Sequence, residues 1–476
     1  MKIEISTKPG NQKCIIIPFI KGEVDHKKIN HFSGIRLDEQ FDGSFKSIEK
    51  IYLPDNRLVY LLGLGENSEE GRWHHAFRLL AFKERKHWGK EITILSDHLG
   101  PHVDEAAALG IRLSAYQIGI YKSEKAEKTR DKLRINLPDR EESNIEKSLI
   151  IAETMIRVME LVDAPGNKKP PAYLGKWAED SAEKYGYKAN VIKGKDLEKE
   201  GLWALQAVGK GSAYPPVLIT CEYKPARMKK DAPIIGLVGK GVTFDTGGLS
   251  IKKAQNMHYM KSDMGGAAAV LGMVELAARL KLNVHIVGIV GSAENAVDAE
   301  SYRPGDVIDS YSGKTIEIID TDAEGRVILA DALAYINKKF SPDWLIDLAT
   351  LTGSAVMALG YSSGALFSHN DKLAEILTSA GNKVYERVWR MPLFDDFDPD
   401  IESDVADVRN LSGKPVAGAI TAAKFLEYFT DEHPRWAHLD IAGVAFGDSD
   451  FSKMKSASGF GPRLLLEVIE QLRENS

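Results

Sequence analysis

The sequence predicts an α/β protein in which a smaller N-terminal α/β domain precedes a larger C-terminal domain with a mostly parallel central sheet flanked by helices. Three observations predict this fold class. Short apolar runs that fit strands alternate with stretches whose apolar residues recur at helical spacing. The alternation is regular over the second half, as in chains that build parallel sheets. A chain of 476 residues, 43% of them hydrophobic, is long enough to bury two cores.

Composition and charge limit the kinds of protein that this chain can be. A formal net charge of -6 argues against a protein whose main role is to coat nucleic acid or anionic membrane. The sequence shows neither the long apolar run of a membrane span nor a signal peptide at its start, so we expect a cytoplasmic protein with no membrane partner. Cys14 and Cys221 lie far apart and lack metal-site spacing, so we expect two inert thiols.

The N-terminal domain is expected to cover residues 1–140. Within it, the apolar runs at 58–64 and 92–95 fit strands, and charged amphipathic stretches lie between such runs. This mixture predicts an α/β unit.

A helix and a short linker are expected to connect the two domains. Apolar residues recur at helical spacing from 145 to 162, and the segment 164–167, which contains Pro and Gly, ends that pattern. We therefore assign residues 141–171 to the connection and residues 172–476 to the second domain.

Five short segments of the second domain are apolar or rich in β-formers, and we expect them to be strands of one sheet. They are 234–238, 284–290, 316–319, 344–348 and 436–441. Ligands bind beyond the carboxyl ends of such strands, so the polar residues that follow them are candidates for a site. The helix expected after Gly265 and Gly266 is apolar on nearly every face, which predicts that it is buried and holds its first residues rigidly.

The first two polar segments lie at 238–248 and 260–266. The glycines of the first segment do not form a nucleotide loop, because Phe244 stands where the dinucleotide motif needs Gly. This segment contributes Lys240 and Asp245 as candidates. The second contributes Asp263, which on its own would most simply cap the buried helix that follows.

The third polar segment, at 318–326, lies between an expected strand and a helix expected from 327 to about 340. In extended backbone, residues two apart share a face, so we expect Asp322, Glu324 and Arg326 to point the same way. Taken alone, such a run would be a solvated loop with a salt bridge.

Four carboxylates from these three segments, Asp245, Asp263, Asp322 and Glu324, indicate a site for divalent metal. Without cations, packing them together would cost on the order of several kcal/mol. Oxygen ligands favour Mg, Mn or Zn over copper or an iron-sulfur cluster. We expect two ions, because a pair can share carboxylates and bind both a water and a carbonyl. Lys240 could bind a metal only as the neutral amine, and spacing leaves that role open.

Histidine does not complete this site in the sequence. His258 lies near the acidic segments, but no pair of histidines has ligand spacing, and His285 and His438 fall inside expected strands. We expect all three to be structural or surface residues. Met260 either lines an apolar substrate pocket or packs in the core, and the sequence does not decide between these two roles.

With these motifs in view, residues from about 150 to 470 resemble the leucyl aminopeptidase, or cytosol aminopeptidase, family. The resemblance rests on many separate motifs in the order in which the family has them. These are 238–241, 244–248, 260–269, 321–326, 349–353, 418–421, 436–443 and 458–461. The first domain matches only loosely, through 61–65.

The resemblance implies a metal-dependent aminopeptidase that removes N-terminal residues, leucine and similar ones, from peptides through a water activated by two metals. By this resemblance, Asp245 and Glu324 would bridge two divalent ions in each subunit. Lys240 and Asp263 would complete the more labile site, and Asp322 would serve the other. The ions would be Mn or Zn, with Mg or Co as alternatives.

The same resemblance assigns the remaining roles. Lys252, together with a metal, would stabilise the developing oxyanion, and Arg326 would hold a bicarbonate that acts as general base. Met260 and Thr350 would line the pocket for the first side chain, and the backbone of Leu351 would contact the substrate. The family resemblance also implies a homohexamer whose catalytic domains, residues 172–476 here, face an inner cavity.

Two departures from the family and two alternatives complete the picture. Asp320 and Val327 stand where the family usually has Asn and Leu, and Asp320 adds negative charge beside Asp322.

One alternative to an aminopeptidase is a DNA-binding or assembly role on the same scaffold, which the acidic balance argues against. The other is an inactive homologue kept as a scaffold, which the full set of proposed ligands argues against.

Overall fold

The computed structural model describes residues 2–6, 13–25, 41–96, 98–118, 120–123, 132–137, 142–228 and 233–474. The chain forms two compact units. The first consists of Met1–Ile156, Lys383–Tyr385 and Asp450–Ser452, and the second of Arg157–Asn382, Glu386–Ser449 and Lys453–Ser476. The boundary expected between residues 140 and 141 lies outside the described residues, as does the first residue of the chain.

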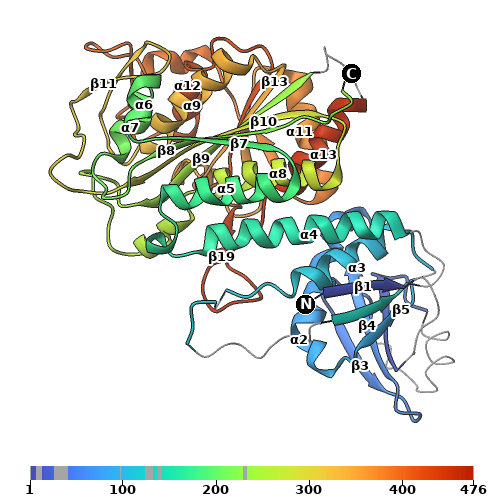
Figure 1. Cartoon of the computed structure of the whole chain (residues 1–476). Coiled ribbons are helices and arrows are strands. Elements are labelled where there is room, and N and C mark those ends of the chain that lie inside the picture. The colour runs from blue at the N-terminus through green and yellow to red at the C-terminus, as the bar shows by residue number, and fades with distance from the viewer. Residues whose placement is uncertain are drawn as a thin grey trace. The chain divides into compact units, whose positions relative to one another are not determined.

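The first unit is an α/β unit built on a six-stranded sheet in the order β1-β6-β5-β2-β4-β3 (Figure 1). Its strands are β1 Lys2–Ser6, β2 Cys14–Ile20, β3 Ile48–Tyr52, β4 Leu58–Gly65, β5 Glu91–Ile94 and β6 Lys132–Asn136. All neighbours are parallel except β3 and β4. The strands predicted at 58–64 and 92–95 are therefore confirmed as β4 and β5.

Helices cover one face of this sheet. They are α2 Trp73–Glu84 and α3 His102–Leu113, and the short 3-10 helices η1 Asn67–Arg72 and η2 Arg85–His87 directly precede and follow α2. Apolar side chains of α2 and α3, such as Phe77 and Ile111, share one core cluster with Tyr60 and Leu62 of β4. The alternate residues of β4, Val59 and Leu61, belong to a second cluster, so both faces of the strand are buried.

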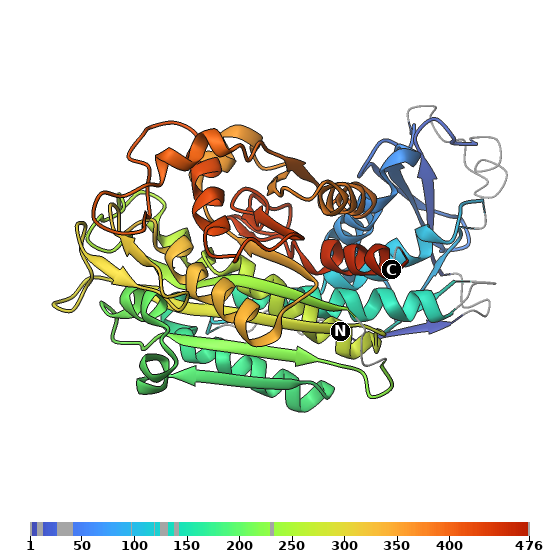
Figure 2. The same ribbon diagram turned by 90° about the horizontal axis from the view of Figure 1, so that it is seen from above.

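The second unit is built on an eight-stranded sheet in the order β15-β14-β17-β13-β9-β10-β8-β7 (Figure 2). Its strands are β7 Lys188–Lys193, β8 Val217–Tyr223, β9 Ile234–Asp245, β10 His285–Asn295, β13 Trp344–Ala349, β14 Gly364–Phe367, β15 Val388–Arg390 and β17 Trp436–Asp440. The four central strands are mutually parallel, whereas β7, β8 and β14 run antiparallel to a neighbour. The predicted mostly parallel central sheet is thus confirmed.

Helices lie on both faces of this sheet (Figures 1 and 2). On one face are α5 Pro171–Tyr185, α8 Gly265–Leu280 and α13 Pro462–Glu474; on the other are α6 Lys195–Glu200, α7 Trp203–Gly209, α9 Glu324–Phe340 and α12 Gly418–Glu427. Helix α4 Glu142–Asp163 begins in the first unit and ends in the second. The remaining helices are η3 Gly166–Lys168, η4 Met257–Ser262, α10 Gly353–Leu359, α11 Asp371–Val384 and η5 Asp395–Asp400. As predicted, α8 is buried from Gly265 to Ala278.

The strand predicted at 316–319 does not belong to the central sheet. It is β12 Thr315–Glu317, which pairs with β11 Val307–Asp309 and β16 Val408–Arg409 in a separate three-stranded sheet. Only Ile316 of β12 is buried, whereas β13 is buried throughout. A strand with one apolar face fits a small half-exposed sheet better than a core sheet covered on both faces. A short hairpin, β18 Phe446–Gly447 and β19 Ser456–Ala457, completes the strands.

The central strands reach further than the sequence pattern predicts. β9 continues to Asp245 and β10 to Asn295, past the ends expected at 238 and 290. Lys240 and Asp245 therefore lie on the strand itself, where the backbone is held by its neighbours.

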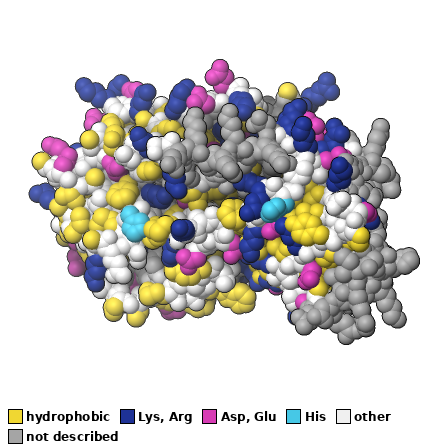
Figure 3. Space-filling model, turned by 90° about the horizontal axis from the view of Figure 1, so that it is seen from below, with side chains coloured by type: hydrophobic (Ala, Val, Ile, Leu, Met, Phe, Trp, Pro, Cys, Tyr) yellow, Lys and Arg dark blue, Asp and Glu magenta, His cyan; other side chains and the backbone are white. Residues whose placement is uncertain are grey.

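The surface of the chain mixes residue types. On the face drawn in Figure 3, basic side chains lie among acidic and apolar ones. None of the helices in the described part of the chain combines the length and apolar character that crossing a bilayer requires.

Candidate metal centre

Three carboxylates converge beyond the carboxyl end of β9. One oxygen each from Asp245, Asp322 and Glu324 lie within 4.8 Å of one another. Asp245 ends β9, Asp322 lies in the turn before α9, and Glu324 is the first residue of α9. Asp245 and Glu324 are buried and Asp322 is half-buried, so these charges have little access to solvent.

Lys240 joins the fourth carboxylate to this group. Its Nζ lies 2.7 Å from Oδ2 of Asp263 and 2.9 Å from Oε1 of Glu324. The same Nζ donates a hydrogen bond of 3.0 Å to the carbonyl of Thr350. The buried helix α8 begins two residues after Asp263, so this carboxylate is held by a rigid element, as the sequence predicts.

Lys252 occupies the other side of the cluster. Its Nζ lies 2.7 Å from Oδ2 of Asp245 and 2.5 Å from Oδ1 of Asp322. The loop that carries Lys252 turns at Gly247, whose φ of 88° is left-handed. A Cβ at this position would lie 2.8 Å from Oδ1 of Asp322, so only glycine allows the loop to pass this close.

The expectation of extended backbone through Asp322, Glu324 and Arg326 is wrong. Glu324 and Arg326 lie in the first turn of α9, which begins three residues earlier than predicted. A glutamate in the first turn favours this start, since it interacts well with the helix dipole. Residues two apart on a helix diverge, and Nη1 of Arg326 instead donates a 2.8 Å hydrogen bond to the carbonyl of Asn410.

Sequence reasoning missed two residues that support the cluster. Nδ2 of Asn295 donates to Oδ1 of Asp245 at 2.9 Å and to the carbonyl of Thr321 at 3.0 Å. Oγ1 of Thr321 donates to the carbonyl of Gly247 at 2.6 Å and accepts from the backbone N–H of Ser250 at 2.8 Å. The position of Asn295 at the carboxyl end of a parallel strand is the signal that could have identified it.

Burial and mutual repulsion act on the carboxylates together. Burial, followed by the charge of Asp245, raises the pKa of Asp322 to about 7 and also raises that of Glu324. Burial alone would lower the pKa values of Lys240 and Lys252, but the surrounding carboxylates outweigh it and raise both. Four carboxylates face two ammonium groups and the guanidinium of Arg326, so acidic groups still outnumber basic ones at the cluster.

The donor atoms fit divalent metal ions. Oε2 of Glu324 is buried and has no hydrogen-bond partner within the described ranges. Oδ2 of Asp263 and Oδ1 of Asp322 contact a lysine but also lack a partner with hydrogen-bond geometry there. Buried carboxylate oxygens that converge with unused lone pairs are the donor set that hard divalent cations prefer.

Comparison with known proteins gives the family. Residues 157–466 match the family model described as "Cytosol aminopeptidase family, catalytic domain", which covers more than half of the chain. The chain belongs to the cytosol aminopeptidase family. Membership supports aminopeptidase activity, a hydrolysis of peptide substrates.

Individual relatives of the family agree with this assignment. A probable cytosol aminopeptidase from Chlorobium phaeobacteroides is 41% identical over 436 residues, which cover 87% of this chain and 86% of that protein. A solved mutant of tomato leucine aminopeptidase has a TM-score of 0.88 at 31% identity, over 99% of this chain and 97% of that one. The bottromycin maturation enzyme BotP, solved in complex with Mn, has a TM-score of 0.83 at 31% identity, over 97% of this chain and 100% of that one.

Arg326 provides a positive charge next to the carboxylate cluster. Its side chain is buried, and its Nε has no hydrogen-bond partner among the described residues. Burial lowers the pKa of Arg326 to about 10, against the charges of Glu324, Asp440 and Asp320. The guanidinium stays charged at neutral pH, and its Nε–H can donate a hydrogen bond to a small anion.

The residues that the family resemblance assigns to the substrate pocket lie at different distances from the cluster. Oγ1 of Thr350 donates to Oδ1 of Asp263 at 2.8 Å, so Thr350 borders the carboxylates directly. The backbone N–H of Leu351 donates to Oδ1 of Asp440 at 3.1 Å. Met260 lies in η4, the 3-10 helix that ends just before Asp263, and is partly exposed.

The histidines lie in structural or surface positions in this family member. His258 is exposed, Nε2 of His285 lies 2.9 Å from Oε1 of Glu222, and Nδ1 of His438 lies 2.6 Å from Oδ1 of Asp347. Asp320, the departure from the family, accepts the backbone N–H of Asp322 at 2.8 Å through Oδ1. This carboxylate therefore supports the turn before α9.

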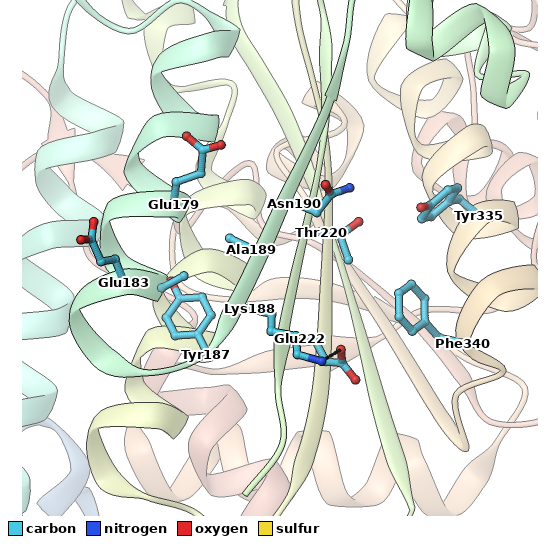
Figure 4. Close-up of a pocket in the computed structure, with 11 residues that line it drawn as sticks. Glu179, Glu183, Tyr187, Lys188, Ala189, Asn190, Thr220, Glu222, Tyr335 and Phe340 are labelled. Carbon is cyan, nitrogen blue, oxygen red and sulfur yellow. Dashed lines mark ion pairs between the residues drawn. The ribbon is translucent and has the colours of Figure 1, made fainter. Parts of the chain in front are cut away.

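A hollow of about 590 Å³ borders the edge strand β7, away from the acidic cluster (Figure 4). Glu179 and Glu183 of α5 lie on one side of the strand, and Tyr335 and Phe340 of α9 lie on the other. None of the proposed metal ligands lines this hollow, so it is separate from the candidate centre.

Proposed function

We propose that this chain is a two-metal aminopeptidase that hydrolyses N-terminal residues, leucine and similar ones, from peptides. The observation that carries this proposal is the convergence of oxygens from Asp245, Asp322 and Glu324 within 4.8 Å of one another, where the buried Oε2 of Glu324 has no hydrogen-bond partner among the described residues. The related BotP, solved in complex with Mn, supports a divalent ion in such a cluster. Two ions per subunit, Mn or Zn with Mg or Co as alternatives, would supply an activated water and polarise the peptide carbonyl.

In this proposal the protein residues divide the cluster between two ions. Asp245 and Glu324 would be shared by both ions, Lys240 and Asp263 would complete one site, and Asp322 would serve the other. Lys240 binds only as the neutral amine, so metal loading releases its proton.

The two lysines take different roles because they differ in exposure. The side chain of Lys240 is 4% exposed, whereas that of Lys252 is 23% exposed and can reach a substrate. We therefore assign Lys252 to the developing oxyanion of the peptide carbonyl.

Arg326 and the pocket residues complete the proposed reaction. The Nε–H of Arg326, which has no partner among the described residues, would hold a bicarbonate, and this anion would supply the general base. Met260 and Thr350 line the pocket for the first side chain of the peptide, and the backbone of Leu351 contacts the substrate. The proposed assembly is a homohexamer in the cytoplasm, and light scattering would give six times the 52.5 kDa of one chain.

Variants of the ligands test this function. Asp322→Ala and Glu324→Ala each remove an oxygen donor, and we expect hydrolysis of a chromogenic leucine amide to fall to background after loading with Mn. Circular dichroism should show an unchanged fold. Asp309→Ala, which removes an exposed acid on β11, is the control and should retain full activity. Full activity in both ligand variants would reject the proposal.

A further inference from the structure

Asn295 is completely buried beside the carboxylate cluster. It is 0% exposed and is the last residue of β10, directly opposite Asp245 of β9. The ladder between the two strands is irregular at this point, because Ala293 pairs with Val242 but Asn295 pairs with Asp245. β9 thus uses one residue more than β10, and such a bulge redirects side chains. The bulge places the amide of Asn295 next to the carboxylate of Asp245.

The side-chain amide of Asn295 donates two hydrogen bonds, each to a different segment of the chain. One goes to Oδ1 of Asp245 and the other to the carbonyl of Thr321, the residue before Asp322. Its Oδ1 has no hydrogen-bond partner among the described residues and lies against Gly248, where a Cβ would come within 2.9 Å. One small side chain therefore ties the end of β9 to the turn that carries Asp322.

The chemistry of an amide suits this place. Oδ1 of Asp245 accepts two neutral donors, Nδ2 of Asn295 and the backbone N–H of Gly247, both at 2.9 Å. A lysine in place of Asn295 would add positive charge that repels a metal, and an aspartate would repel Asp245. A neutral donor orients the carboxylate and leaves its negative charge available to a cation.

Thr321 also has a second donor, which offers an internal comparison. The hydroxyl of Tyr302 donates to the same Thr321 carbonyl at 2.9 Å. Removal of this hydroxyl weakens the hold on Thr321 but leaves the contact between Asn295 and Asp245 in place.

We propose that Asn295 is a positioning residue, which holds Asp245 and the turn before Asp322 in the arrangement that binds divalent metal. This inference rests on the proposed two-metal function. Residues that support metal ligands through hydrogen bonds typically change metal affinity about 10–100-fold when they are replaced. Asn295 acts through Asp245 and Thr321 and does not touch the substrate.

The test compares Mn binding to metal-free protein, with free Mn measured by electron paramagnetic resonance. Asn295→Leu keeps the size of the side chain and removes both donors, and we expect Mn affinity to fall about 10–100-fold. Tyr302→Phe is the comparison, and its Mn affinity should fall clearly less than that of Asn295→Leu. Equal loss in both variants would overturn the inference, since the bridge to Asp245 would then be irrelevant. Wild-type affinity in Asn295→Leu would overturn it as well.

Kinetics separate positioning from a general structural role. At saturating Mn, Asn295→Leu should regain much of its kcat for a leucine amide with an unchanged KM, because excess metal compensates for weak binding. A low kcat that added Mn does not raise would contradict the inference. Asn295→Ser, whose hydroxyl is too short to span both acceptors, replaces the leucine variant if that variant does not fold. Wild-type protein that binds no Mn would instead reject the proposed function itself.

Discussion

Gly325 shows how closely side chains pack around the proposed metals. A Cβ at this position would lie 2.4 Å from Cε and 2.6 Å from Nζ of Lys240. Because Lys240 is buried between two carboxylates, it has no room to move aside. Glycine is a poor helix former, so its presence as the second residue of α9 serves the close approach of the lysine and not the helix.

Replacing Gly325 separates activity from helix stability. In Gly325→Ala the new methyl group pushes Lys240 away from Asp263 and Glu324, and we expect peptidase activity to fall at least about tenfold. The helix itself gains up to about 1 kcal/mol from alanine. Activity assays with thermal unfolding check both effects, and Gly447→Ala, which meets no atom within 4 Å, is the control. Unchanged activity in Gly325→Ala would contradict a fixed position for Lys240.

The sequence predicts the carboxylates of the cluster but not the residues that hold them in place. Asp245, Asp322 and Glu324 follow strand patterns and carry charge, so chemistry alone marks them, and the structure brings them together. Asn295 carries no charge, and its role depends on a β-bulge that no local pattern encodes. The direction of Arg326 was predicted wrongly, because two-residue spacing has a different meaning on a helix than on a strand.

At the scale of elements, apolar patterns predict where strands and helices exist, and they are less reliable about where these end. β9 was expected to end at 238, but its polar and glycine residues continue the ladder to Asp245, because neighbouring β10 satisfies their backbone groups. β12 was predicted in the wrong sheet, because the alternation of apolar and polar residues along a strand does not indicate which strand it pairs with. Partner choice is decided by packing over long sequence distances.

Helix α4 ends in an arrangement that the sequence does not reveal. Lys169 is 0% exposed, and its Nζ donates to the carbonyls of Leu161 and Val162, each at 2.7 Å. Nζ of Lys261 donates to the carbonyl of Asp163 at 2.7 Å. These lysines satisfy carbonyls at the C-terminus of the helix that have no partner within it.

Removal of Lys169 should destabilise this end of the fold. Lys169→Met leaves two buried carbonyls without a donor, and we expect the free energy of unfolding to fall by about 1–3 kcal/mol at neutral pH. Burial, followed by the charge of Lys261, lowers the pKa of Lys169 well below 10.5. The unfolded chain therefore binds more protons than the folded chain below pH 10.5, so this lysine stabilises the fold more as pH rises.

Urea unfolding at pH 7 and pH 9 measures both effects. The difference in unfolding free energy between wild type and Lys169→Met should be larger at pH 9. Lys168→Met, at the exposed neighbouring lysine, is the matched control and should behave as wild type at both values. An equal difference at the two pH values would contradict the lowered pKa of Lys169.

At the scale of the whole molecule, the chain folds as two units that each have their own sheet, as composition and alternation predict. Two short segments, Lys383–Tyr385 and Asp450–Ser452, belong to the first unit although they lie far along the chain. Their membership depends on contacts made only in the folded chain, so no sequence pattern could have predicted it. The excess negative charge at the cluster is also a property of the assembled fold.

Metal removal should therefore lower the stability of the molecule. A ligand that binds only the folded state stabilises it by about 2.7 kcal/mol at one hundred times its Kd. We expect chelation with EDTA to lower Tm and Mn to restore it, as followed by scanning calorimetry. Glu324→Ala, which removes a proposed bridging ligand, should respond to neither treatment. If neither EDTA nor Mn changes the Tm of the wild type, metal bound at the cluster does not stabilise the fold.

The most direct test of a two-metal centre is a crystal structure of the chain grown with Mn, with anomalous diffraction collected at the manganese edge. We predict two anomalous peaks, each within about 2.5 Å of oxygens of Asp245 and Glu324. One peak should also contact Lys240 and Asp263, and the other should contact Asp322. A map with no peak among these side chains, or with the carboxylates paired only to lysines, would contradict the account.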